Sequence, residues 1–293
     1  MFYRKKILLA ITELFGGELS TTDFQKLLFI FSVKQTKRRF DFVPYKFGCF
    51  SFQASADKKS LIKEGYLENS TGWSLKIGSE NFISTLNESD RKQLQQLKLR
   101  FSNFTTNELI RYVYLHYPYY AINSEIATKY LSKDELEVIQ KFKPKDEKIK
   151  LFTIGYEGKS LESYLNILIQ KNVNVLCDVR KNPLSRKYGF SKKTLQNACE
   201  SVNIRYYHLP ELGIISEKRR NLNSQSDYDD LFAEYEQSVI PNQQKALKFI
   251  SDLLNNYCRV ALTCFEALPK KCHRTRVANA VHGFDKNIPL LHL

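Results

Sequence analysis

The sequence predicts a mostly helical domain over residues 1–140, followed by an α/β domain over residues 151–293 with a mainly parallel sheet covered by helices. From Leu151 onward, short apolar segments typical of strands alternate with segments of helical periodicity. Before residue 140, apolar side chains recur mainly at helical spacing. Between the two, residues 141–150 (KFKPKDEKIK) are charged, contain proline and lack apolar periodicity, which predicts a linker.

The first 76 residues predict three helices followed by a hairpin. Apolar residues at helical spacing follow Ser20, Thr21 and Thr22, which are good N-cap residues. A later helix ends near Gly65, and YLENSTGWSLK predicts a hairpin with a polar tip. With PYKFGCFS and LIKEGYL, this order resembles the winged-helix-like domains of bacterial regulators, although Cys49 stands where their pattern usually has proline.

A winged-helix-like domain implies a DNA-binding function. Four basic residues follow the candidate recognition helix and are predicted to contact phosphates of nucleic acid: Lys34, Lys37, Arg38 and Arg39. The alternative is a solvated helix end. In the second domain, EKRRN (residues 217–221) could likewise contact nucleic acid or simply be exposed to solvent.

The second domain predicts four strands, over residues 150–158, 173–180, 204–210 and 259–266. Helices are expected over 160–172, 191–203, 227–255 and 269–281. In open parallel sheets, ligands bind beyond the carboxyl ends of the strands. The polar residues expected at this edge are Tyr156, Asp178, Arg180, Ser185, Arg186, His208, Cys264 and Glu266.

The last predicted helix brings further reactive groups to this edge. Pro269 suits an early helical position, so Cys272 and His273 are expected in the first turns. The positive end of the helix dipole and neighbouring cations, including Arg274, should then lower the pKa of Cys272.

Four motifs of the second domain occur in a recognisable order: TIGYEG, DVRKNPLSRKYGFS, YYHLPELG and CFEALPKKCHR. This order resembles the family called domain of unknown function 488, over about 140 residues from Leu151 to the end. The resemblance implies an α/β fold and a likely site, but no established reaction. Residues 1–140 lie outside it.

These residues lead us to expect an enzyme, a hydrolase or transferase, that processes nucleic acid or a nucleotide at a glycosidic bond or a modified base. Asp178 or Glu266 would act as nucleophile or general base, and His273 would move the proton. Cys264 is a further catalytic candidate. Substrate or phosphate contacts are assigned to Tyr156, Arg180, Ser185, Arg186, His208, Cys272 and Arg274.

Three alternatives remain open. Cys264 or Cys272 could act as a nucleophile. The charged residues could form structural ion pairs. The chain could instead be a non-catalytic DNA-binding regulator whose second domain senses a nucleotide-like effector.

No metal or cofactor is predicted. Cys264, Cys272 and His273, with Asp178 or Glu266, could supply zinc ligands, but adjacent residues on a helix point about 100° apart. Cysteine pairs with CxxC spacing are absent, as are glycine-rich phosphate loops.

The composition indicates the class of partner. The 293 residues carry a net charge of +14, which favours nucleic acid, DNA more than RNA, with a nucleotide-like small molecule also possible. No membrane contact is expected, because no apolar run of the length of a membrane span occurs. The start of the chain is expected to be a first helix and not a signal peptide, because Glu13 and Glu18 interrupt its apolar run, so a cytoplasmic protein is expected. In an intracellular chain, the six scattered cysteines predict free thiols. Bacterial defence or repair would be natural settings for the expected enzyme.

Overall fold

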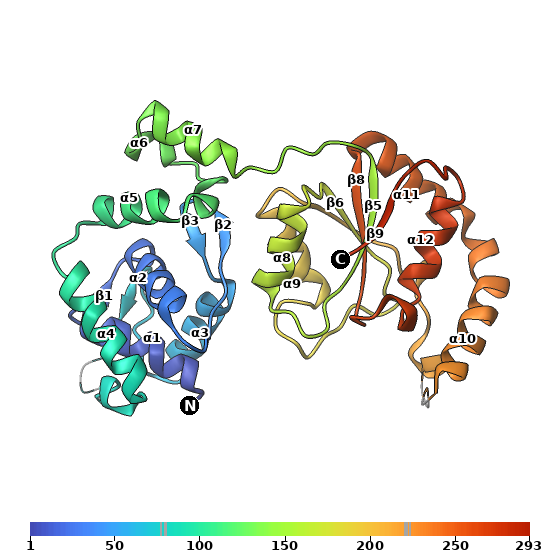
Figure 1. Ribbon diagram of the computed structural model, residues 1–293. Coiled ribbons are helices and arrows are strands. Elements are labelled where there is room, and N and C mark those ends of the chain that lie inside the picture. The colour runs from blue at the N-terminus through green and yellow to red at the C-terminus, as the bar shows by residue number, and fades with distance from the viewer. Residues whose placement is uncertain (77, 79–80, 220–221, 223) are drawn as a thin grey trace. The chain divides into compact units, whose positions relative to one another are not determined.

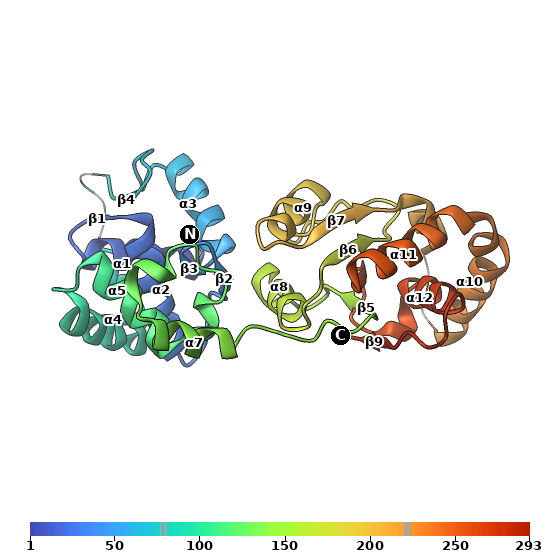
Figure 2. The same cartoon turned by 90° about the horizontal axis from the view of Figure 1, so that it is seen from above.

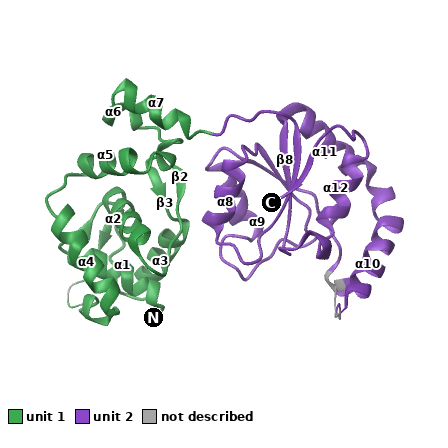
Figure 3. Ribbon diagram, in the orientation of Figure 1, with its two compact units in different colours: residues 1–143 green, residues 144–293 purple. Residues whose placement is uncertain are grey.

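The computed structural model describes residues 1–76, 78, 81–219, 222 and 224–293, and its chain forms two compact units, Met1–Lys143 and Pro144–Leu293 (Figure 3). Helix α7 (Lys133–Lys141) ends and strand β5 (Lys150–Gly155) begins on either side of this division. No helix among the described residues is both long enough and apolar enough to cross a bilayer.

The first unit is mostly helical. Its elements before α7 are α1 (Tyr3–Leu14), β1 (Glu18–Leu19), α2 (Thr21–Lys34), β2 (Val43–Tyr45), β3 (Gly48–Phe50), α3 (Phe52–Lys63), β4 (Trp73–Ser74), η1 (Ile83–Thr85), α4 (Glu88–Phe101), α5 (Thr106–His116), η2 (Pro118–Ala121) and α6 (Ala127–Tyr130). Ser20 caps α2, because its hydroxyl accepts a hydrogen bond from the Asp23 backbone N–H. β1 pairs antiparallel with β4, and the ring of Trp73 stacks 3.5 Å from that of Phe24 in α2.

The second unit contains a five-stranded sheet. After β5, its elements are α8 (Leu161–Gln170), β6 (Val175–Asp178), α9 (Lys192–Glu200), β7 (Arg205–His208), η3 (Pro210–Leu212), η4 (Ser216–Arg219), α10 (Gln225–Ser238), η5 (Ile240–Gln243), α11 (Gln244–Tyr257), β8 (Arg259–Cys264), η6 (Pro269–Lys271), α12 (Arg274–His282) and β9 (Leu290–His292). The strand order is β7-β6-β8-β5-β9, and every pairing of these strands is parallel.

Two expectations for this unit need correction. The sheet has a fifth strand, β9, which the sequence did not predict. The long helix expected over 227–255 is two helices, α10 and α11, separated by the short η5, which contains Pro241. Proline has no N–H to continue the hydrogen-bonding of α10, so the chain turns there.

Helices cover both faces of the sheet: α8 and α9 lie on one face, and α11 and α12 lie on the other (Figures 1 and 2). The inner strands are therefore buried along their length, which explains their continuous apolar runs. The register aligns the strand ends, with Asp178 opposite His208 and Gly155 opposite Cys264. Side chains at these ends therefore meet at one edge of the sheet.

Candidate functional site

A cavity of about 480 Å³ opens at the carboxyl edge of the sheet. Seven of the predicted site residues line it: Tyr156, Arg180, Ser185, Arg186, Cys264, Glu266 and His273. The described residues that line the cavity do not include the other four predicted site residues of this unit: Asp178, His208, Cys272 and Arg274. The edge therefore has an outer group of residues that face the cavity and an inner group that supports them.

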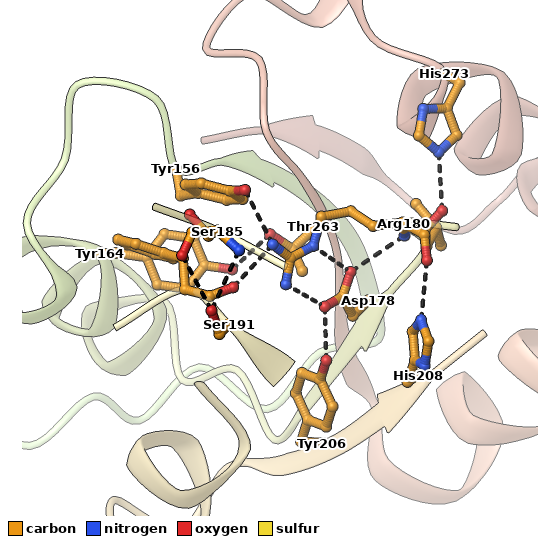
Figure 4. A network of polar contacts seen from close by, with 12 residues as sticks. Tyr156, Tyr164, Asp178, Arg180, Ser185, Ser191, Tyr206, His208, Thr263 and His273 are labelled. Carbon is orange, nitrogen blue, oxygen red and sulfur yellow. Dashed lines mark hydrogen bonds and ion pairs between the residues drawn. The ribbon is translucent and has the colours of Figure 1, made fainter. Parts of the chain in front are cut away.

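The side chain of Asp178 is fully buried and bonded at both oxygens (Figure 4). Its Oδ1 accepts from Arg180 Nε at 2.8 Å, and its Oδ2 accepts from Arg180 Nη2 at 2.5 Å. The Tyr206 hydroxyl also donates to Oδ2, at 2.6 Å. This geometry favours a positioning role for Asp178 over the direct catalytic role that the sequence suggested, because a substrate cannot reach a carboxylate so enclosed.

The guanidinium of Arg180 is held nearly rigid. Its Nη1 donates to the hydroxyl of Tyr156 and to the backbone oxygen of Phe190, both at 2.9 Å. Burial lowers the pKa of Arg180, but the hydrogen bonds and charge of Asp178 outweigh burial, so the net pKa is raised. Four of its five N–H groups therefore have protein partners, and the guanidinium also interacts with Tyr206.

Two histidines hold the backbone beside this pair (Figure 4). The Nε2 of His208 lies 2.9 Å from the backbone oxygen of Arg180, and the Nε2 of His273 lies 2.9 Å from that of Val179. Because a carbonyl only accepts, each Nε2 carries a proton and donates it. His208 therefore acts on the edge through the backbone, and its contact with a substrate stays a prediction.

The loop after β8 crosses directly over the end of β5. A Cβ atom added to Gly155 would lie 1.8 Å from the backbone oxygen of Glu266, so only glycine allows this approach. The guanidinium of Arg274 donates to the backbone oxygens of Glu266 and Ala267, and the carboxylate of Glu157 accepts from the Ala267 N–H. Arg274 is fully buried, so its predicted phosphate contact needs correction: it holds the loop that carries Glu266.

The predicted environment of Cys272 also needs correction. The chain after Pro269 makes the single 3₁₀ turn η6, Cys272 is extended with φ −135° and ψ 131°, and α12 begins only at Arg274. Cys272 is fully buried, and this burial raises the pKa of its thiol, where the helix-dipole argument expected a lowered value. A buried thiol with a raised pKa is a poor nucleophile.

This extended conformation lets the two neighbours Cys272 and His273 point toward Cys264. The two sulfur atoms and one imidazole nitrogen all lie within 4.8 Å of one another. The Cys264 sulfur is 3.7 Å from His273 Nδ1 and 3.4 Å from Glu266 Oε2. The assumption of a regular helix, which argued against a shared metal ion, is therefore wrong for these residues.

Residues 160–281 match the model of a family described as Domain of unknown function DUF488. The C-terminal half of this chain resembles DUF488. The match is shorter than the expected resemblance from Leu151 to the end, because it leaves out β5, Tyr156 and β9. No curated protein and no solved structure matches the chain.

Within the DUF488 region, the loop after β6 supplies most of the polar cavity wall. Arg186 is exposed, and Ser185 accepts a hydrogen bond at its hydroxyl from the Lys187 N–H at 3.1 Å. Sequence reasoning missed Lys181 and Asn182, which also line the cavity. Their position directly after Arg180 was the available signal.

The predicted nucleic-acid contacts lie in the other unit, outside the DUF488 match. Lys34, Lys37, Arg38 and Arg39 are all exposed, at the end of α2 and in the segment after it. The guanidinium of Arg39 lies 5.3 Å from the ring centre of Tyr3. In EKRRN, residues 220 and 221 lie outside the described residues.

Proposed function

We propose that this chain is an enzyme, a hydrolase or transferase, that processes a nucleotide or nucleic acid in the cavity at the edge of the sheet. The observation that carries the proposal is the combination in one cavity wall of Arg180, Lys181 and Arg186 with the carboxylate of Glu266. Cationic side chains suit phosphate groups, and a nearby carboxylate suits bond cleavage at a sugar carbon.

Glu266 takes the role of nucleophile or general base. It is half-buried and faces the cavity, and Gly155 and Arg274 fix the backbone that carries it. Arg186 and Lys181, which line the cavity, bind the phosphate. The net charge of +14 supports a polyanionic substrate.

The test is product formation. The full chain is incubated with mixed nucleotides, DNA and RNA, and released bases and ribosyl products are measured by mass spectrometry. Glu266→Gln should lower turnover by about 10²–10⁴-fold, the usual range for a general acid or base. Glu200→Gln, an exposed glutamate at the end of α9, is the matched control and should leave turnover unchanged.

A second variant tests the phosphate site. Arg186→Ala should raise KM about tenfold or more, because it removes a charged hydrogen bond to the substrate. Lys193→Ala, an exposed cation on α9, is the control. For the first variant, Glu266→Gln, full activity would contradict the chemistry assigned to this glutamate.

A DNA-binding regulator is the second candidate. Its support is the exposed basic group Lys34, Lys37, Arg38 and Arg39, together with the order of helices and short strands in the first unit. Tight DNA binding that a small nucleotide changes, with no product from any substrate, would favour this candidate. Substitution of the four basic residues by glutamine would then weaken binding and reduce its salt dependence.

A further inference from the structure

The structure brings together three strong metal ligands next to the cavity. Cys264 is the last residue of β8, and Cys272 and His273 precede α12. All three are buried, and their two sulfurs and one nitrogen lie within 4.8 Å of one another. Thiolates and imidazole are the ligand types that zinc prefers.

The separation between the Cys264 sulfur and His273 Nδ1 fits a tetrahedral zinc ion. Zinc–sulfur bonds of about 2.3 Å and zinc–nitrogen bonds of about 2.0–2.1 Å place a sulfur and a nitrogen ligand about 3.6 Å apart. The Cys264 sulfur lies 3.7 Å from His273 Nδ1. Little movement is therefore needed for both atoms to contact one ion.

The histidine is oriented as metal-binding histidines usually are. Its Nε2 donates to the backbone oxygen of Val179 at 2.9 Å, so in the neutral ring Nδ1 has a free electron pair directed at Cys264. Histidine ligands commonly donate their second nitrogen to a carbonyl in this way, which fixes the ring and the tautomer.

We infer that Cys264, Cys272 and His273 bind one Zn²⁺ ion, with its fourth coordination position directed toward the cavity beside Glu266. Cys264 and His273 both line the cavity, so the ion is reachable from it. On binding, both thiols release their protons to solvent, and each sulfur bonds to the metal as a thiolate. Three protein ligands and one open position are typical of catalytic zinc sites. Metal binding does not depend on the proposed nucleotide chemistry.

The test begins with the full wild-type chain, purified under reducing conditions, stripped with a chelator and dialysed. It should then take up one equivalent of Zn²⁺, measured by mass spectrometry of the metal. One equivalent of Co²⁺ should instead give sulfur-to-cobalt charge-transfer absorption and the strong visible bands of a tetrahedral site. These measurements need no variant, so they do not depend on how a variant folds.

Cys264→Ser and Cys272→Ser should each lower zinc affinity more than 100-fold, beyond the 10–100-fold that loss of a supporting residue costs. Cys258→Ser is the control, because this half-exposed cysteine lies outside the group and is the most accessible thiol among the six. Retention of one equivalent in both cysteine variants, or absence of the charge-transfer band in wild type, would overturn the inference. If zinc binds but no substrate is turned over, the metal site stands and the proposed function fails.

Discussion

The ends of two neighbouring strands, β6 and β8, carry polar groups that are organised in opposite ways. At the end of β6, the carboxylate of Asp178 is bonded on both oxygens by Arg180 and Tyr206. At the end of β8, Cys264, Cys272 and His273 converge through long, weak contacts to sulfur. Strong donors and acceptors that satisfy one another hold the fold in place, whereas two thiols and an imidazole that converge form a set of groups of the kind that binds a metal ion.

The largest effect should come from breaking the β6 network. Asp178→Asn replaces a carboxylate oxygen with a donor that faces Arg180 or Tyr206, and it leaves the buried guanidinium without its counter-charge. We expect a loss of about 3–5 kcal/mol in the free energy of unfolding, measured with urea.

The double variant Asp178→Asn/Arg180→Met is the control for that experiment. Removing the buried charge along with its partner should recover much of the lost stability, because the desolvation cost of the unpaired guanidinium disappears. A loss below about 1 kcal/mol in the single variant would contradict the network interpretation.

An intermediate effect is expected at Tyr206. Tyr206→Phe removes one hydrogen bond to a buried charged group and should cost about 1.5–3 kcal/mol. Tyr207→Phe is the matched control one residue along β7, because the Tyr207 ring packs against Phe249 on the other face of the strand. If both substitutions cost the same, the Tyr206 hydroxyl adds nothing specific.

The smallest effect should come from the β8 end in the absence of metal. In chelator-treated protein, Cys264→Ala removes one small buried side chain with weak polar bonds and should cost about 1 kcal/mol. Cys199→Ala, at a fully buried cysteine of α9, should cost about the same. A loss for Cys264→Ala as large as that for Asp178→Asn would show that the two strand ends do not differ as described.

The alternation of strands and helices after Leu151 was readable from sequence, and it places Asp178, Arg180, Cys264 and Glu266 at one edge of the sheet. Periodicity reports which face of a segment is buried, and that is a local property. Strand β9 escaped this reasoning because it is only three residues long, too short for an alternating pattern to be recognised.

The chemical state of the edge was decided by tertiary packing. The sequence by itself determined the residue types, their order and their shared edge. Whether Asp178 is enclosed, whether Arg274 contacts a loop or a ligand, and whether Cys272 meets Cys264 depend on residues distant in sequence. Burial and distances of a few ångströms control pKa values and metal binding, and these quantities exist only after the strands, loops and helices have packed together.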